Sequence, residues 1–370
     1  MRSKAIVIAL ALFLVGAFTV ASADEAVLID FSLLKADIFP DPVNQGKFLD
    51  NRATMMDFSG TAGASYTDEQ KKQMRTSLAI RNWDVVLASS SRSNLNQALS
   101  MTAEASIASD AKQYAGNTVM GLRVHFPIAD FNSWARVQPP FEIPAFEPKA
   151  TIDDQGNITP AAANAQGTDP VNARLTRFEG SYDPNTKITT ALGVVKNVGI
   201  IKSVAVDVKG LNFPHGLSVV LIDADGNPQT IFLGYLNFDG WRELRWDNPE
   251  YVQDVRNREL RLYPLYPKST PMVKFGGFVI TRDAASDGGD FVAYVKDVKM
   301  LYDKAVLETG RDIDDEAIWG IVGKKEEERK NIEAKHFGAD QVLRYLERMK
   351  EATGNDFTTA APAAAPAAKP

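Results

Sequence analysis

The fold class is decided by the stretch Lys274-Phe-Gly-Gly-Phe-Val-Ile-Thr-Arg-Asp283, followed by Gly288-Gly-Asp-Phe-Val-Ala-Tyr-Val-Lys-Asp-Val-Lys-Met-Leu-Tyr-Asp303. Short apolar runs rich in Val, Phe and Tyr are bounded by Gly and Asp, which is typical of strands joined by turns. In the second run the apolar positions change face near Lys296, which indicates a twist or a bulge there. Nothing in these stretches has the pattern of a catalytic constellation.

The same pattern recurs through much of the chain. Asp225-Gly-Asn227 has the composition of a hairpin turn and lies between two apolar runs. Many short strands without alternating long helices favour a sandwich over a parallel α/β sheet. We therefore expect a mainly β protein, a jelly-roll or lectin-like (galactose-binding-like) β-sandwich with C-terminal helices. Further strands are expected at 26–34, 84–88, 119–126, 201–208, 217–222, 230–236 and 260–263.

Other segments differ from this pattern. The stretch 147–176 is rich in Pro, Ala, Asn and Gly and predicts a loop insertion within one β-sandwich domain at 24–305, although a domain boundary is the alternative. Helix formers predict a helix at 68–79 and a helical extension at 306–352, broken or kinked at Gly338. The Ala/Pro-rich tail at 353–370 is expected to be disordered.

The N-terminus has the pattern of an export signal. Arg2 and Lys4 precede an uncharged, mostly apolar run, and Ala21-Ser22-Ala23 forms a small-x-small cleavage site. A membrane anchor is the alternative, but the run is short for the ~30 Å of a bilayer core. We therefore predict a signal peptide at 1–23, cleavage between Ala23 and Asp24, a periplasmic product and no membrane anchor.

Composition narrows the classes of partner. The chain carries 41 basic and 47 acidic residues, and removal of 1–23 leaves 39 basic residues and a net charge of −8. A net negative charge without a basic tail argues against nucleic acid and against anionic membranes as partners. The chain has no Cys, which excludes disulfides, thiolate metal sites and thiol catalysis.

The polar residues of the chain indicate neither an active site nor a cofactor site. His125, His215 and His336 are far apart and have no spaced partners. The loop Asp283-Ala-Ala-Ser-Asp-Gly-Gly-Asp290 could bind calcium, but solvated turn residues are the simpler interpretation. Glu243 with Asp247 or Asp239 could suggest glycoside hydrolysis, which needs a fixed carboxyl separation that proximity on a strand does not establish. We expect no catalytic, cofactor or metal residues.

One group of aromatic and arginine side chains is a candidate partner interface, because these residue types are enriched at protein interfaces. The alternatives are packing in the core and rim of the sandwich, or stacking of the aromatic rings on sugars. The set consists of Trp241, Arg242, Arg245, Trp246, Tyr251, Arg256, Arg258 and Tyr263.

The order of these segments resembles one family. The segments are Trp241-Arg-Glu-Leu-Arg-Trp246, the two stretches quoted first, Arg81-Asn-Trp-Asp-Val-Val-Leu-Ala-Ser-Ser-Ser-Arg-Ser93, and Val119-Met-Gly-Leu-Arg-Val-His-Phe-Pro127. They are similar to the outer-layer (sheath) protein of the spirochaete periplasmic flagellar filament, FlaA. The resemblance implies a secreted structural subunit that coats a flagellin core and supports motility. Its partners would be flagellin subunits, copies of itself or other sheath proteins. A periplasmic carbohydrate-binding β-sandwich module and a periplasmic glycosidase remain the alternatives.

Overall fold

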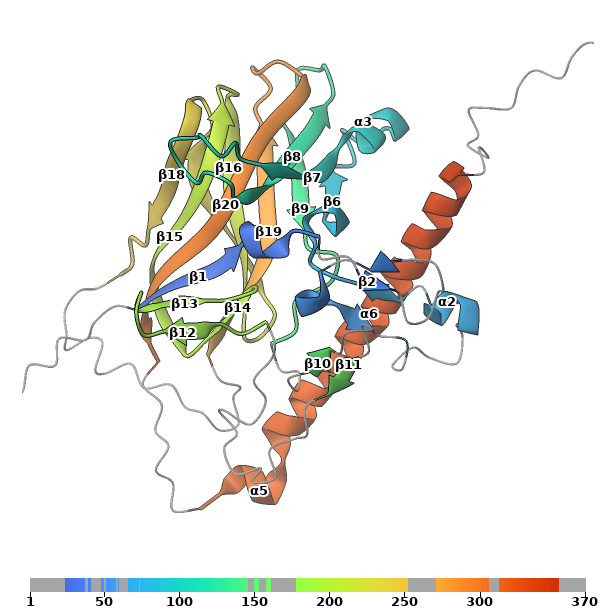
Figure 1. Cartoon of the computed structure of the whole chain (residues 1–370), viewed down its shortest axis with the longest axis vertical. Coiled ribbons are helices and arrows are strands. Elements are labelled where there is room, and N and C mark those ends of the chain that lie inside the picture. The colour runs from blue at the N-terminus through green and yellow to red at the C-terminus, as the bar shows by residue number, and fades with distance from the viewer. Residues whose placement is uncertain are drawn as a thin grey trace, which may run out of the picture.

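The computed structural model (Figure 1) describes residues 24–36, 39–40, 48–49, 51–57, 59, 66–72, 74–145, 150–152, 158–160, 178–251, 271–305 and 313–352. The predicted signal peptide at 1–23, the predicted strand at 260–263 and the predicted disordered tail at 353–370 lie outside the described residues.

Two large antiparallel sheets form the body of the molecule. The larger sheet has eight strands, in the order β12-β13-β1-β20-β15-β18, with β8 also paired to β20 and β7 paired to β8. Among its described strands, β1 and β13 pair in parallel and the other paired strands are antiparallel. The strands are β1 (Asp24–Asp30), β7 (Met101–Ser106), β8 (Thr118–Phe126), β12 (Ser181–Asp183), β13 (Ile188–Thr190), β15 (Val198–Leu211), β18 (Asp239–Asp247) and β20 (Gly289–Lys304).

The second sheet has six strands, in the order β17-β16-β19-β9-β6, with β14 paired to β19. Its strands are β6 (Asp84–Leu87), β9 (Ser133–Gln138), β14 (Val194–Lys196), β16 (His215–Asp223), β17 (Pro228–Tyr235) and β19 (Met272–Arg282). Three two-stranded pairs lie outside these sheets: β2 (Phe39–Pro40) with β3 (Phe48–Leu49), β4 (Met56–Asp57) with β5 (Arg75–Thr76), and β10 (Ala150–Ile152) with β11 (Ile158–Pro160).

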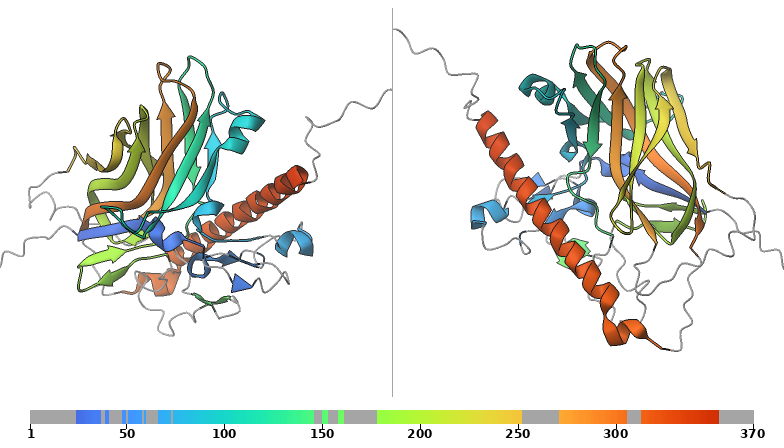
Figure 2. Two further views of the ribbon diagram at one scale, coloured as in Figure 1. Left: turned by 45° about the horizontal axis from the view of Figure 1, so that its top comes forward. Right: turned by 180° about the vertical axis from the view of Figure 1, so that it is seen from behind.

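The chain passes repeatedly from one sheet to the other. β8 is followed by β9 in the opposite sheet, and the same change occurs from β15 to β16, from β17 to β18 and from β19 to β20 (Figure 2). Such alternation between two facing sheets is characteristic of jelly-roll sandwiches. The predicted mainly β sandwich is therefore confirmed. The turn at Asp225-Gly-Asn227 also joins β16 to β17 as predicted.

The core fills the space between the sheets. Inward residues of the larger sheet, such as Val124 and Val206, belong to the same buried cluster as Val219 and Ile280 of the smaller sheet. These residues alternate with outward ones, which is why their period of two was readable in the sequence. Burial of this apolar surface is the main stabilising term.

The change of face in β20 is present at the place that the sequence indicates. Phe291, Ala293 and Val295 face the core before it, and Val298 and Met300 face the core after it. The register with β15 shifts at the same point, so β20 contains an irregularity of the β-bulge type. Lys296 and Asp297 are thereby left together on the outer side of the larger sheet.

Helices flank the sandwich. They are α2 (Asp68–Lys72), α3 (Asn94–Leu99), α5 (Asp315–Trp319) and α6 (Ile321–Ala352), with short 3-10 turns η1 (Phe31–Leu34), η2 (Arg52–Thr54) and η4 (Ile80–Asn82).

The helix predicted at 68–79 is wrong beyond Lys72, because β5 pairs with β4 and Met74 and Leu78 are buried in the core. The segment 147–176 holds the β10–β11 hairpin, which the loop prediction missed.

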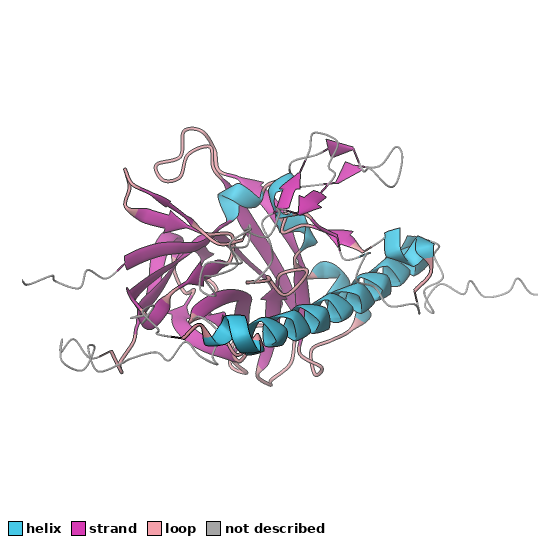
Figure 3. Ribbon diagram, turned by 90° about the horizontal axis from the view of Figure 1, so that it is seen from below, coloured by secondary structure: helices cyan, strands magenta, loops and turns pink. Residues whose placement is uncertain are grey.

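The long helix α6 passes obliquely below the sandwich and crosses it in the view from below (Figure 3). The predicted break at Gly338 is wrong, since α6 continues to Ala352. A Cβ at Gly338 would lie 3.4 Å from Met74 Sδ, so this glycine permits close packing of the helix. Phe337 is buried and its ring centroid lies 5.8 Å from that of Phe141.

Candidate partner-binding surface

β18 carries most of the described residues of the predicted interface. Within the part of the chain that the structure describes, it pairs only with β15 and therefore lies at an edge of the larger sheet. Alternate residues of a strand face opposite sides. Leu244 and Trp246 face the core, whereas Trp241, Glu243 and Arg245 face outward.

The core-facing side of β18 combines packing with one exposed cation. Leu244 is buried in the core cluster, and Trp246 is partly buried against it. The guanidinium carbon of Arg242 lies 4.3 Å from the centroid of the Phe238 ring, within the range of a cation–π contact. Trp246 is therefore mainly a packing residue, whereas Arg242 remains exposed.

The outward side of β18 is charged and partly aromatic. Trp241 contacts Tyr114 edge-on, with ring centroids 5.0 Å apart. Arg245 Nε donates to Asp247 Oδ1 at 2.8 Å, and both side chains are exposed. An exposed pair of this kind contributes little to folding, so its charges are available to a partner at small cost to the monomer.

The remaining predicted residues do not join this surface. Tyr251 Oη donates to Asp303 Oδ2 at 3.0 Å, and Lys202 Nζ lies 5.2 Å from the centroid of the Tyr251 ring. These contacts hold Tyr251 against the body of the domain. Arg256, Arg258 and Tyr263 lie outside the described residues. The described part of the predicted set thus reduces to the exposed Arg242 on the core-facing side of β18 and, on its outward side, the exposed Arg245 and the half-buried Trp241.

An ionic network that the sequence analysis missed lies beside this surface. Lys299 Nζ donates to Asp207 Oδ2 at 2.8 Å and lies 3.6 Å from Glu243 Oε2. Asp297, which the β20 bulge turns outward, is buried and pairs with Lys296. The sequence did contain a signal, because charged residues stand in the middle of apolar strands. Nothing in the sequence, however, indicated that β15 pairs with β20.

The network shifts the titration of its members. Burial, followed by a hydrogen bond with Asp207, raises the pKa of Tyr114 to about 12. Burial also works against the charged form of Lys299, but its hydrogen bond with Asp207 and the neighbouring carboxylates outweigh this and raise the pKa of Lys299. Lys299 is therefore an ammonium at every physiological pH and anchors this face electrostatically.

The two histidines whose side chains are described play different parts. His125 Nδ1 lies 2.9 Å from Asp290 Oδ1, and Arg123 donates to the same carboxylate. The hydrogen bond from Arg123, with that of His125, lowers the pKa of Asp290. This exposed cluster belongs to neighbouring strands β8 and β20. Asp290 is therefore engaged by side chains of its own sheet.

His215 is buried between aromatic rings. Its ring centroid lies 4.8 Å from that of Phe291 and 5.1 Å from that of Phe126. Neither ring nitrogen has a hydrogen-bond partner among the described residues. Burial, with a contribution from Arg282, lowers the pKa of His215 from 6.5 to about 4. The imidazole is thus a neutral packing group at neutral pH.

The burial of His215 predicts that the folded protein loses stability at acid pH. Below pH 6.5 the unfolded chain binds a proton at His215 that the folded chain does not bind until about pH 4. Stability should therefore fall as the pH falls, by about 2 kcal/mol between pH 7 and pH 5. In His215→Phe this part of the loss should disappear. Urea unfolding of both proteins at several pH values measures it, and parallel curves would contradict the assignment to His215.

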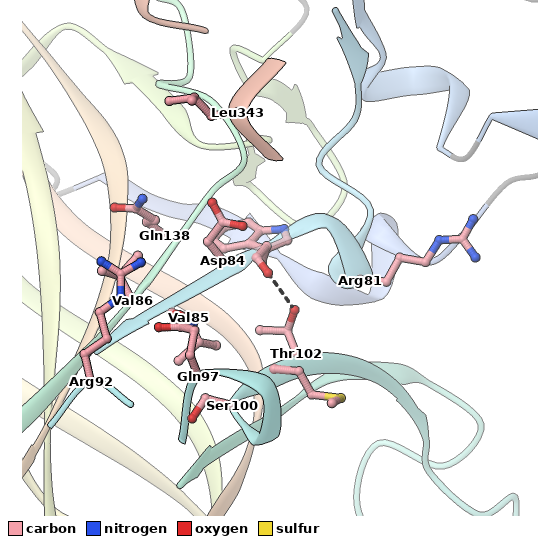
Figure 4. Close-up of a pocket in the computed structure, with 12 residues that line it drawn as sticks. Arg81, Asp84, Val85, Val86, Arg92, Gln97, Ser100, Thr102, Gln138 and Leu343 are labelled. Carbon is pink, nitrogen blue, oxygen red and sulfur yellow. Dashed lines mark hydrogen bonds between the residues drawn. The ribbon is translucent and has the colours of Figure 1, made fainter. Parts of the chain in front are cut away.

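A surface hollow of about 370 Å³ lies between β6, α3, β7 and Leu343 of α6 (Figure 4). Its polar groups stabilise the fold: Thr102 Oγ1 lies 2.7 Å from the Ile80 carbonyl oxygen and 3.2 Å from that of Trp83, and Gln97 Nε2 donates to the Val85 carbonyl at 2.6 Å. Arg92 also lines it. A nucleophile with an adjacent general base does not occur among its described lining residues, so we assign it no chemistry.

The acidic loop predicted as a possible calcium site has local partners. Tyr235 Oη lies 3.4 Å from Asp283 Oδ2, and Asp290 binds Arg123 and His125. Among the described residues, no three His, Cys, Asp or Glu side chains converge in a way that could hold a metal ion. Nor does any described helix combine the length and the apolar character needed to cross a membrane.

Comparison with known proteins defines the class. A sequence model of the family described as "Flagellar filament outer layer protein Flaa" matches residues 47–311. The chain belongs to this family. It is 50% identical over 355 residues to a flagellar filament outer layer protein of Treponema pallidum (strain Nichols), covering 96% of both chains. A protein of the same name from Spirochaeta aurantia is 44% identical over 350 residues, covering 95% of this chain and 94% of the relative.

Solved structures are more distant. The active domain of a bacteriophage CBA120 tailspike protein covers 60% of this chain and 20% of its own, with 8% identity and a TM-score of 0.26. TmCBM61 in complex with β-1,4-galactotriose covers 60% of this chain and 84% of its own, with 11% identity and a TM-score of 0.19.

Proposed function

We propose that this chain is a structural component of the periplasmic flagellar filament, forming its outer layer around a flagellin core and supporting motility. The observation that carries the proposal is 50% identity across 96% of both this chain and a flagellar filament outer layer protein. Its role is structural rather than catalytic. Its partners are flagellin subunits of the core and other subunits of the layer, including further copies of this chain.

The exposed Arg242 and Arg245, on the two faces of the edge strand β18, support this role. Arginine and tryptophan are enriched among the residues that dominate binding energy at protein interfaces. The edge of β18 beside them carries backbone groups without a strand partner among the described residues, and such edges favour association unless they are protected. A partner with acidic side chains that wraps around this edge would meet both arginines.

Export follows from the signal peptide predicted at 1–23. Cleavage between Ala23 and Asp24 would leave β1 whole, because β1 begins at Asp24 and this residue pairs with Tyr302 of β20. Asp24 Oδ1 also accepts from Lys304 Nζ at 3.1 Å. N-terminal sequencing of the periplasmic protein should therefore begin at Asp24. A mature protein that begins inside β1, or one that retains Met1, would contradict this cleavage site.

Charge reversal tests the surface. The double variant Arg242→Glu/Arg245→Glu places new carboxylates beside Glu243 and Asp247. We expect the monomer to remain folded, because both arginines are exposed, and binding to flagellin core filaments to weaken about thirtyfold, the effect of a 2 kcal/mol hot spot. Co-sedimentation of purified protein with stripped core filaments over a concentration series measures this change.

The matched control is Arg92→Glu, which reverses an exposed charge in the turn before α3. It should bind like the wild type. If the folded double variant also binds like the wild type, the β18 surface is not a filament contact. If the wild type itself fails to sediment with core filaments, the proposed function is wrong.

The carbohydrate-binding alternative has less support. Sugar platforms present open aromatic faces, whereas Trp241 packs against Tyr114 and Trp246 packs against the core. Glycan-array binding by a protein that does not bind core filaments would favour this alternative.

A further inference from the structure

The junction of α5 and α6 exposes more apolar surface than folding requires. Ile313, Ile318 and Trp319 are 60%, 62% and 61% exposed, and Ile321 is also exposed. We call these four side chains the α5 knob. Single exposed apolar residues are ordinary, but four within nine positions form a patch of the kind that marks interaction sites.

The α5 knob has a defined shape. Asp314 Oδ1 accepts from Ala317 N at 3.0 Å and caps α5. Glu316 accepts from Val322 N at 3.1 Å and from Gly323 N at 2.9 Å, which caps α6. Gly320, with φ 58°, makes the left-handed turn between the helices. Asp315 adds a third carboxylate, so the knob is apolar with an acidic border.

A hollow on the larger sheet has the complementary character. It measures about 670 Å³ and lies between the loop at 107–117 and the neighbouring ends of β15, β18 and β20. Ile107, Leu211, Tyr294 and Trp241, which it shares with the outward side of β18, are among its apolar walls, and Lys112 and Lys209 are its charged residues. No carboxylate is among its described lining residues, and neither lysine forms an ion pair within the described part of the chain.

The knob and the hollow lie far apart on the molecule. In Figure 1, α5 lies below the sandwich, whereas β7, β18 and the loop after β7 lie in its upper half. A knob therefore cannot reach the hollow of its own chain. A contact between different surfaces of two copies is head-to-tail and, unless its rotation closes a ring, generates an extended array.

We propose that the α5 knob of one copy inserts into the hollow beneath the loop 107–117 of the next copy, giving head-to-tail contacts along the outer layer. The acidic border of the knob then meets Lys112 and Lys209, and Trp319 meets the apolar walls. This inference rests on the proposed function, because it names the contact between neighbouring subunits of that layer.

Cross-linking tests the contact directly, since the chain has no Cys of its own. Ile318→Cys and Gln113→Cys are made in separate chains with tags of different size, then mixed and oxidised, both in solution and on core filaments. We expect a cross-linked heterodimer at several times the yield of the control pair Ile318→Cys with Thr230→Cys, which places the second thiol on exposed β17. A yield no greater than that of the control overturns the inference.

Three further variants distinguish this specific contact from non-specific association. Trp319→Ala should weaken association about thirtyfold, the effect of a 2 kcal/mol hot spot.

Lys112→Glu/Lys209→Glu in the Gln113→Cys chain should lower the yield of the cross-link, and Asp315→Lys in the partner chain should restore it. Failure of this rescue, with all variants folded by circular dichroism, counts against the contact. Loss of the cross-link in chains that still coat core filaments overturns only the inference, whereas a wild type that does not coat them overturns the proposed function.

Discussion

Arg282→Leu is expected to lower the free energy of unfolding by about 3–5 kcal/mol. Arg282 is 1% exposed, which is unusual for a charged side chain. It lies at the end of β19 and donates to Ser133 Oγ and to the carbonyls of Ala129, Phe131 and Ser286 at 2.6–3.0 Å. Leucine would leave the buried Ser133 hydroxyl and three partly buried carbonyls without this donor, and unsatisfied buried groups cost about 1–3 kcal/mol each.

The same change affects the loops at this end of the sandwich. Arg282 joins the β8–β9 connection to the β19–β20 connection, so its guanidinium fixes two turns between the paired ends of these strands. Arg282→Lys keeps the charge but lacks the planar fork, and we expect an intermediate loss. Arg245→Leu, at an exposed position, should change stability by less than about 0.5 kcal/mol. Urea unfolding measures all three, and similar midpoints for Arg282→Leu and Arg245→Leu would refute this account of the buried arginine.

The sequence predicted the long strands of the two sheets better than the segments around them. β15, β16, β19 and β20 were readable because one face of each is buried, which imposes a period of two on the apolar residues. β9 was missed because Trp134 and Arg136 interrupt its short apolar pattern at outward positions. The helix at 68–79 was extended too far because helix propensity is overridden where Met74 and Leu78 enter the core. The pairing of the strands depends on the whole chain, so no local sequence pattern indicated it.

The candidate surface was predictable only in part. Residue type identified Trp241 and Arg245 as interface candidates, but it could not show that Trp246 and Tyr251 face the body of the domain. The link between Asp207 and Lys299 crosses 92 positions of sequence, so only the β15–β20 register reveals it. The exposure of Trp319 was likewise hidden, because an amphipathic stretch does not show which of its faces the sandwich covers.

The second large effect is expected at the start of the described chain. Phe31 is fully buried, and its ring contacts Trp83 at 5.4 Å, Phe278 at 6.0 Å and Phe275 at 6.4 Å between centroids. Truncation of a buried Phe to Ala costs about 3–5 kcal/mol, through lost burial and the cavity left behind. Phe31→Ala should therefore remove a large share of a stability that is about 5–15 kcal/mol for most proteins.

The position of Phe31 makes this loss informative about folding. Phe31 opens η1 directly after β1, where Asp30 Oδ1 accepts from Ser32 N at 2.9 Å and fixes the turn. β1 itself lies inside the larger sheet between β13 and β20, and Phe31 directly after it packs against Phe275 and Phe278 of the smaller sheet. Phe31→Leu, which keeps most of the apolar volume, should cost less than half as much as Phe31→Ala. Thermal and urea unfolding test both variants, and equal stability of Phe31→Ala and wild type would show that the N-terminal segment does not contribute to the core.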